Sequence, residues 1–283
     1  MSKKLTTKEI STLEGYAKTI RSNIIAMITE SQSGHPGGSL SAADILTTLY
    51  FAEMNIDPKN PQKMDRDRLV LSKGHAAPVL YATLAERGFF PKEELLTLRK
   101  INSRLQGHPS MKSLPGIDMS TGSLGQGLSV ASGMALAARL DGSTHRIYAI
   151  LGDGELEEGM VWEGAMFAAH YKLDNLTAFV DFNGLQIDGP VSQVMSPLPI
   201  PDKWRAFNWN VIEIDGHDIK AIYDAIQVAK TAKGQPTMIV ASTIKGKGVC
   251  QMENKAEWHG AAPSREQCEL FMAELNDIEK GGN

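Results

Sequence analysis

The stretch that decides the fold runs from residue 146 to 185 and reads RIYAILGDGELEEGMVWEGAMFAAHYKLDNLTAFVDFNGL. Residues 146–151 form a short, β-branched apolar run that stops at a glycine, which is typical of a buried parallel strand. Residues 159–171 are apolar almost all the way round and long enough for a buried helix. Residues 176–182 form a second apolar run. The stretch therefore predicts a strand–helix–strand unit.

Polar residues follow both strands of this unit. A crossover between parallel strands has one hand, so Asp153 and Asn183 are expected at the same carboxyl edge, where open α/β sheets bind ligands. A carboxylate, an amide oxygen and the Leu185 carbonyl are too few to enclose Ca²⁺ but suit Mg²⁺, which also takes phosphate oxygens. Gly154 lets a phosphate approach the backbone, and the helix beginning near Gly159 favours its charge. Gly-Asp-Gly alone also fits a plain turn, but Asn183 favours a metal site.

The same residues carry a resemblance to a known family. Gly-Asp-Gly followed thirty residues later by Asn is the fingerprint of thiamine diphosphate enzymes, and the chain from about Tyr16 to Pro263 resembles transketolase. The motifs that carry the resemblance are SGHPGGSLSAADIL, LSKGHAAPVLYATLAERG, GHPS, TGSLGQGL, GDGELEEGMVWEG, DFNGLQIDG, STIKGKGV and WHGAAP. It covers only the amino-terminal part of that enzyme. It implies thiamine diphosphate and Mg²⁺ as cofactors, with Ca²⁺ or Mn²⁺ as substitutes.

Further strand–helix alternation extends the unit into one domain. Strands are expected at 68–71, 210–215 and 237–242, with helices at 7–29, 41–51, 72–87, 91–100 and 218–230. This alternation predicts an α/β fold with a doubly wound, mostly parallel sheet and helices on both faces, and the resemblance implies the thiamine diphosphate-binding type. Residues 1–283 are expected to form a single domain, with 264–283 as a carboxyl-terminal helix and tail.

Composition restricts the classes of function. The chain has 283 residues, 42% of them hydrophobic, which is enough for a sizeable core. A formal net charge of −4 gives no reason to expect nucleic acid. Cys250 and Cys268 make neither a disulfide framework nor a metal-ligand spacing. No segment resembles an export signal or a membrane span, so we expect no membrane partner and a cytoplasmic location.

Cations follow two of the expected strands. Lys73 and His75 open the helix after residues 68–71, and Lys245 follows residues 237–242. Such residues suit a phosphate at a helix amino end, although surface lysines and a capping histidine are equally good interpretations of the motifs alone. The resemblance implies that Lys73, His75, Lys245 and His259 lie near the diphosphate.

Other positions are assigned to the cofactor by the resemblance. It implies that Gly122, Ser123 and Leu124 touch the aminopyrimidine and thiazolium, and that the helix from Gly122 to Leu140 lies at a subunit contact. Most full-length members have proline at the position of Ser123, so the backbone there is expected to be less rigid. The remaining cofactor-binding candidates are Gly152, Gly154, Glu155, Asn183 and Ile187.

Histidines and glutamates complete the candidate catalytic set. Polyhydroxylated substrates need groups that both donate and accept hydrogen bonds near neutral pH, and imidazole does both. The resemblance assigns His35, His108 and His259 to substrate hydroxyls and proton transfer, with His75 also in the catalytic set. It places Glu158, another catalytic candidate, and Glu163 in an acidic network between two active sites. From the sequence alone, these glutamates are simply charges near a helix amino end.

One part of the expected enzyme does not fit in this chain. In transketolases the carboxylate that activates the aminopyrimidine comes from a second domain of a neighbouring subunit, and only twenty residues follow Pro263. We therefore expect the amino-terminal subunit of a split transketolase, active only with a carboxyl-terminal partner subunit in an α2β2 heterotetramer. Through the thiamine ylid it would transfer a two-carbon ketol unit from a ketose or ketose phosphate to an aldose or aldose phosphate. The alternatives are a subunit resembling 1-deoxyxylulose-5-phosphate synthase or a 2-oxo acid dehydrogenase, and a non-catalytic cofactor-binding partner.

Overall fold

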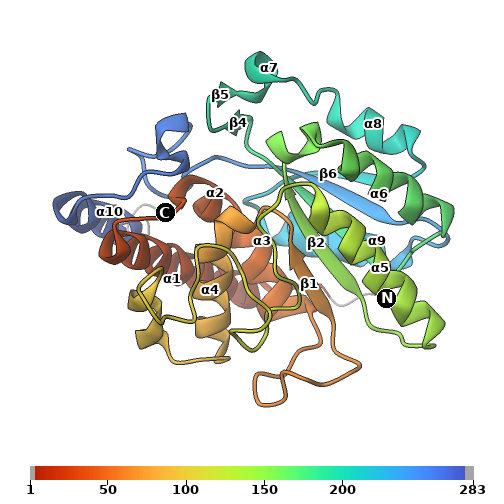
Figure 1. Cartoon of the computed structure of the whole chain (residues 1–283), viewed down its shortest axis with the longest axis horizontal. Helices are drawn as coiled ribbons and strands as arrows, with labels where there is room; N and C mark the ends of the chain where they lie inside the picture. The colour runs from red at the N-terminus through yellow and green to blue at the C-terminus, as the bar shows by residue number, and fades with distance from the viewer. Residues whose placement is uncertain (1–3, 278–283) are drawn as a thin grey trace.

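A five-stranded parallel sheet forms the centre of the chain in the computed structural model, which describes residues 4–277 (Figure 1). Its strands, in spatial order, are β1 (Arg68–Leu71), β2 (Ile147–Gly152), β3 (Leu176–Phe182), β7 (Thr237–Ser242) and β6 (Asn210–Asp215). The ranges expected for β1, β3, β6 and β7 are confirmed residue for residue, and β2 is shifted by one. The order turns back between β3 and β7, so this is the point of the sheet at which a ligand crevice is expected.

Helices cover both faces of the sheet. Residues 147, 149 and 151 of β2 face one core, while Tyr148 and Ile150 face the other, as the two-residue period of a strand requires. The first core is covered by α5 (Gln126–Leu140), α6 (Gly159–His170) and α8 (Ile200–Ala206). The second is covered by α1 (Thr7–Ser31), α3 (Ala43–Thr48), α4 (Ala77–Arg87) and α9 (Ile219–Thr231). The doubly wound fold is confirmed.

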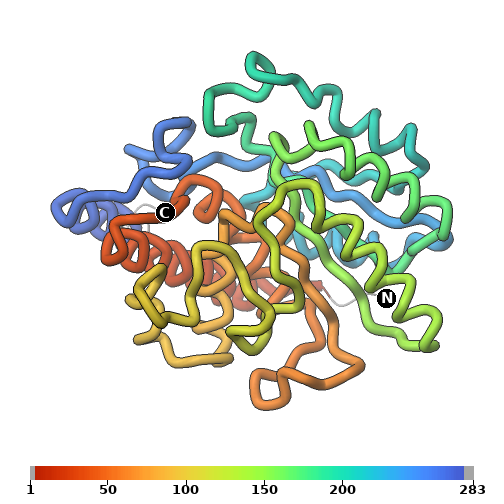
Figure 2. Tube along the Cα trace, viewed as in Figure 1, coloured from red at the N-terminus to blue at the C-terminus, as the bar shows by residue number. Residues whose placement is uncertain are grey.

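Shorter elements surround these layers, and the tube of Figure 2 follows their course. A small antiparallel hairpin of β4 (Leu185–Gln186) and β5 (Gly189–Pro190) follows β3 and leads into α7 (Val191–Val194). The 3-10 turns are η2 (Gly74–Ala76), η3 (Lys92–Thr97), η4 (Gly154–Glu157) and η5 (Ala256–His259). The closing helix α10 (Arg265–Asp277) lies where it was expected, and the expected tail after it falls outside the described residues.

Three expected helices are corrected by the structure. The range expected as one helix at 41–51 holds only α3 and the π-helical turn η1 (Leu49–Glu53), and a separate helix, α2 (Pro36–Ser41), forms before it where a loop was expected. Helix α2 begins at Pro36 because proline is well suited to a first helical turn, where its missing N–H costs nothing. The helix expected at 91–100 forms only the 3-10 segment η3. The helix expected to open at Ser72 begins at Ala77, after the 3-10 turn η2.

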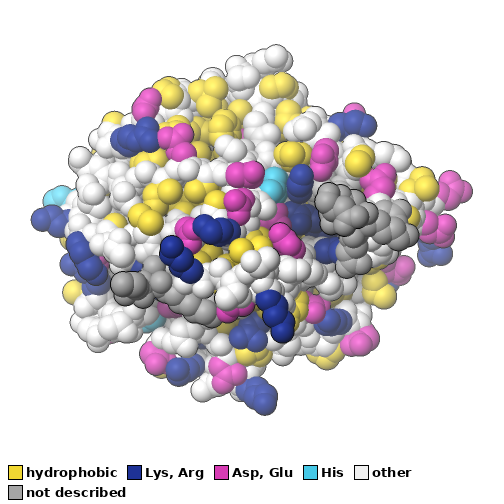
Figure 3. Space-filling view, turned by 180° about the vertical axis from the view of Figure 1, so that it is seen from behind, with side chains coloured by type: hydrophobic (Ala, Val, Ile, Leu, Met, Phe, Trp, Pro, Cys, Tyr) yellow, Lys and Arg dark blue, Asp and Glu magenta, His cyan; other side chains and the backbone are white. Residues whose placement is uncertain are grey.

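The surface shows charges of both signs. On the face opposite to that of Figure 1, basic and acidic side chains are interspersed among apolar and polar areas (Figure 3). Within residues 4–277, no helix has both the length and the apolar character needed to cross a bilayer.

Candidate functional site

A cavity of about 370 Å³ lies at the carboxyl ends of the central strands. Thirteen of the residues expected at the site line it: Lys73, His75, Leu124, Gly152, Asp153, Gly154, Glu155, Glu158, Asn183, Leu185, Ile187, Lys245 and His259. Gly38, Glu157 and Gln186 line it as well. Parallel strands bring these residues together because all of their carboxyl ends meet at one edge.

The three candidate metal ligands meet in this cavity. The Asp153 carboxylate accepts the backbone N–H of Gly154 at 2.8 Å and that of Gly184 at 2.5 Å, which fixes its orientation. The Asn183 side-chain oxygen accepts the N–H of Leu185 at 3.2 Å. Burial, followed by the charge of Asp181, raises the pKa of Asp153 to about 6. A divalent cation beside Asp153 would favour its charged form.

The candidate metal ligands Asp153, Asn183 and the Leu185 carbonyl include a single acidic side chain and no histidine. Residues 4–277 contain no group of three or more His, Cys, Asp or Glu side chains arranged to hold a metal. A cation at Asp153 would thus depend on the Asn183 amide, the Leu185 carbonyl and oxygens from a ligand, as Mg²⁺ commonly does.

Glu155 is bound by three separate segments. Its carboxylate accepts the hydroxyl of Ser72, the N–H of Gly125 at 2.9 Å and the N–H of Gly152 at 3.1 Å. Burial raises its pKa, although these hydrogen bonds oppose the rise. Glu155 therefore joins the end of β1, the start of α5 and the end of β2 around the cavity.

Lys73 is buried beside a carboxylate that sequence analysis did not assign to the site. Its ammonium donates to Asp181, and the two side chains are 2% and 0% exposed. Asp181 also accepts the hydroxyls of Ser41, at 2.6 Å, and Thr243. Burial alone would raise the pKa of Asp181, but the charge and hydrogen bond of Lys73 outweigh it and lower that pKa. Asp181 thereby holds Lys73 at the cavity wall.

Lys245 reaches the same cavity from the end of β7. Its ammonium lies 3.2 Å from the Leu185 carbonyl oxygen and 2.9 Å from Nδ1 of His259. Burial and then the charge of Lys73 lower the pKa of Lys245 to about 8. A cation destabilised in this way is well prepared to receive an anionic ligand.

Three histidine rings gather at the edge of the cavity. Their centroids are 5.3 Å apart for His35 and His75, 5.5 Å for His35 and His259, and 5.2 Å for His75 and His259. Burial, followed by neighbouring cations, lowers the pKa of His35 to about 4 and that of His259 to about 3, and holds that of His75 well below its usual value. All three are therefore neutral near pH 7 and able to donate and accept hydrogen bonds.

His108 stands beside this group without lining the cavity. A Cβ on Gly122 would lie 3.0 Å from the His108 ring, so a glycine there lets the two loops approach. Arg99 lies between them: its guanidinium donates to Ser33 at 2.8 Å and lies 3.5 Å from Nδ1 of His35. Burial, followed by the charge of Arg99, lowers the pKa of His108.

The remaining expected residues lie at or beyond the rim. Ser123 and Glu163 are exposed and do not line the cavity, whereas Glu158 is exposed and lines it. Ile187 lines it from the β4–β5 hairpin with 64% of its surface exposed. Their exposure leaves them accessible to a ligand or to another chain.

The residues present fit a phosphate-bearing cofactor with a divalent cation. The candidate oxygen ligands and the ammonium groups of Lys73 and Lys245 line the same cavity, and the Lys245 ammonium donates to the Leu185 carbonyl oxygen at 3.2 Å. Gly38 lies against this wall, since a Cβ there would be 3.4 Å from the Lys73 ammonium. The fold and cavity thus define an α/β domain that holds a phosphate-bearing cofactor at the edge of its sheet.

Comparison with known proteins identifies the family. Residues 13–275 match the family described as "Transketolase, thiamine diphosphate binding domain". The chain is 49% identical to the 6-deoxy-6-sulfo-D-fructose transketolase subunit SqwG of Clostridium sp. (strain MSTE9), over 93% of this chain and 96% of that one. It is 41% identical to an apulose-4-phosphate transketolase subunit of Phocaeicola vulgatus, over 96% of this chain and 97% of that one. The chain therefore belongs to the transketolase family, as a thiamine diphosphate-binding domain.

A solved structure agrees with this assignment. Transketolase from Leishmania mexicana superimposes with a TM-score of 0.88 at 32% identity, covering 93% of this chain. The chain spans only 41% of that enzyme, whereas it spans nearly the whole length of the two subunit relatives.

Proposed function

We propose that this chain is the amino-terminal subunit of a transketolase built from two kinds of subunit, and that it is inactive without its partner. The observation that supports this most directly is the contrast in coverage: 96–97% of the relatives named as subunits, but 41% of the Leishmania enzyme. The partner would supply the pyrimidine-binding and carboxyl-terminal domains, including the carboxylate that activates the cofactor. The proposed assembly is an α2β2 heterotetramer.

Asp153, Asn183 and the Leu185 carbonyl would hold Mg²⁺ against the diphosphate. Lys73, Lys245, His75 and His259 would face the negative charge of the diphosphate from the remaining sides. The bonds from Gly154 and Gly184 keep Asp153 oriented and leave oxygen lone pairs for a cation. Gly122, Ser123 and Leu124 would lie along the cofactor rings.

The neutral histidines give this half of the site its proposed catalytic role. When bound, thiamine diphosphate supplies the nucleophilic carbon that accepts the two-carbon unit. His35, His108 and His259 would bind substrate hydroxyls and move protons to or from them, because a neutral imidazole both donates and accepts. Burial lowers the pKa of both His35 and His108, and the charge of Arg99, held between their loops, would lower it further and keep the rings neutral.

The substrates we propose are a ketose or ketose phosphate as donor and an aldose or aldose phosphate as acceptor. The relatives' names refer to a sulfonated sugar and a sugar phosphate, which supports a substrate with an anionic group.

The partner is proposed to dock where the chain leaves apolar and acidic groups exposed. Phe167 and Met166 of α6 are 37% and 53% exposed, and the exposed Glu158 and Glu163 lie on the same segment. Small residues along α5 would allow another chain to approach closely.

Purification with the product of an adjacent gene would test the assembly. Mass measurement in solution should give two copies of each chain, and ketol transfer should require both. Substantial transfer by the rigorously purified chain alone would contradict the proposal. A donor and acceptor screen on the complex would then identify the sugars.

A further inference from the structure

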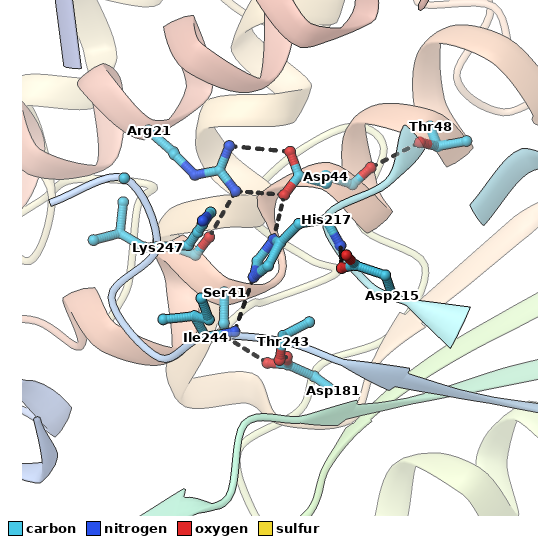
Figure 4. A network of polar contacts seen from close by, with 12 residues as sticks. Arg21, Ser41, Asp44, Thr48, Asp181, Asp215, His217, Thr243, Ile244 and Lys247 are labelled. Carbon is cyan, nitrogen blue, oxygen red and sulfur yellow. Dashed lines mark hydrogen bonds and ion pairs between the residues drawn. The ribbon is translucent and has the colours of Figure 1, made fainter. Parts of the chain in front are cut away.

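A chain of hydrogen bonds connects α1 to the segment that follows β7 (Figure 4). Arg21 on α1 donates to Asp44 on α3 from two guanidinium nitrogens, at 3.0 and 2.5 Å. Asp44 lies 2.7 Å from Nδ1 of His217, and the backbone N–H of Ile244 donates to Nε2 of the same ring at 2.8 Å. The network ends one residue before Lys245.

These bonds fix the position of the proton on His217. A backbone amide can only donate, so Nε2 accepts from Ile244 and carries no hydrogen. The ring proton therefore lies on Nδ1 and is donated to Asp44. Burial alone would raise the pKa of Asp44, but the charge of Arg21 and the bonds from His217 and Arg21 lower it to about 2. Asp44 is thus a carboxylate that holds the imidazole in one tautomer and one orientation.

A glycine brings His217 within reach of Ile244. The N–H of Gly216 donates to the carbonyl of Ser242 at 2.8 Å, which joins the turn after β6 to the end of β7. A Cβ on Gly216 would lie 2.5 Å from the Thr243 side chain, closer than real Cβ atoms come. Only glycine allows this approach without a shift of the turn.

Ile244 stands between two residues of the candidate site. Thr243 donates to Asp181, the carboxylate that holds Lys73. Lys245 extends to the Leu185 carbonyl and to His259. The Thr243 N–H donates to the Phe182 carbonyl and the Lys245 carbonyl accepts from Asn254, both at 2.9 Å. Since Ile244 alone separates Thr243 from Lys245, the bond from its amide to His217 is a further anchor that helps to set where both side chains leave the backbone.

We propose that His217 is a positioning residue for the diphosphate end of the site, acting on Lys245 through the Ile244 amide. Asp44 and Arg21 orient its ring. His217 does not line the cofactor cavity; its side chain is 13% exposed and lines a different cleft with Lys247. The inference rests on the proposed function, because it takes Lys245 to contact the diphosphate.

Replacement of the ring tests this role. His217→Leu removes both polar atoms, whereas His217→Gln retains one acceptor and one donor. The probes are thiamine diphosphate with Mg²⁺ and, separately, inorganic pyrophosphate, titrated calorimetrically into the full chain in the assembly in which it is purified. We expect His217→Leu to raise both dissociation constants about tenfold, the loss expected for one buried hydrogen bond, and His217→Gln to restore most of the affinity. The matched control is His145→Leu, since His145 bonds Ser143 near the opposite end of the sheet and its replacement should leave both constants unchanged.

A double-mutant cycle with Lys245→Met separates positioning from general stability. If His217 acts through Lys245, the double variant should bind no more weakly than Lys245→Met alone. Additive losses, or unchanged binding by folded His217→Leu, would overturn the inference. If His217→Leu does not fold, Gly216→Ala replaces it, because this variant keeps the imidazole ring but displaces the turn that carries it. The same loss of affinity is expected for Gly216→Ala, and unchanged binding by this variant would also overturn the inference. Unchanged binding by Lys245→Met would instead contradict the diphosphate assignment in the proposed function.

Discussion

Replacing Asp181 with asparagine removes the charge that the buried Lys73 ammonium faces. The Asp181 and Lys73 side chains are 0% and 2% exposed, so solvent compensates poorly for the lost partner. Breaking a buried ion pair in this way typically costs about 3–5 kcal/mol, because it leaves one charge uncompensated. The asparagine oxygen still accepts one of the hydroxyls of Ser41 and Thr243, so the ammonium accounts for most of the loss. We expect the free energy of unfolding of Asp181→Asn to fall by that amount.

Urea unfolding followed by tryptophan fluorescence measures this loss, since Trp204 and Trp209 are buried in the core. The double variant Lys73→Met/Asp181→Asn removes both charges and should be more stable than Asp181→Asn alone by about 1–3 kcal/mol. Asp224→Asn is the matched control, because its pair with Lys220 is exposed and should contribute little. A loss for Asp181→Asn no larger than that of the control would refute the reasoning, as would strictly additive losses in the double variant.

Three further predictions concern roles, glycines and pH. His108→Ala should impair turnover of a ketose donor more than it weakens cofactor binding, and His75→Ala should do the reverse, because of these two histidines His75 lines the cavity and His108 does not. Equal losses of both variants in separate titrations of cofactor and donor would contradict this division. Gly74→Ala should destabilise the chain by about 1–3 kcal/mol in thermal unfolding, since its Cβ would lie 2.7 Å from the Gly122 nitrogen. The control Gly133→Ala, on the open surface of α5, should be neutral or stabilising in the same assay. The free energy of unfolding should fall as the pH drops from about 6.5 toward 4. In that range His35 and His259 bind protons in the unfolded chain, whereas in the folded chain, with pKa values of about 4 and 3, they stay neutral. Urea titrations at several pH values check this, and His35→Asn should reduce the slope.

The strands and the main polar edge of the site could be predicted because their signals are local. Apolar runs that end at glycine or a polar turn define β2, β3 and β7, and parallel pairing of β2 with β3 then requires Asp153 and Asn183 to meet. The resemblance added the histidines, and three of them do gather at one cavity edge. The local pattern was misleading around residues 36–41, where Pro-Gly-Gly suggests a loop but forms α2.

The residues that sequence analysis missed depend on contacts between distant segments. Asp181 lies inside an apolar strand and acquires its role only by pairing with Lys73, 108 residues away. His217 bonds Asp44, 173 residues away. Asp44 lies within the motif SGHPGGSLSAADIL, but nothing in the sequence pairs it with His217. Arg99 reaches Ser33 across 66 residues. Sequence spacing gives no signal for such pairs, because they form only when the sheet edge and the loops around it are assembled.

Asp153, Asn183 and the Leu185 carbonyl are proposed to hold a divalent cation that binds the cofactor diphosphate. Calorimetric titration of thiamine diphosphate into the assembled protein, with and without Mg²⁺, tests it most directly when wild type is compared with Asp153→Ala. We predict that wild type binds the cofactor only with the metal and that Asp153→Ala loses this metal-dependent binding. Unchanged affinity and unchanged metal dependence in Asp153→Ala would contradict the account.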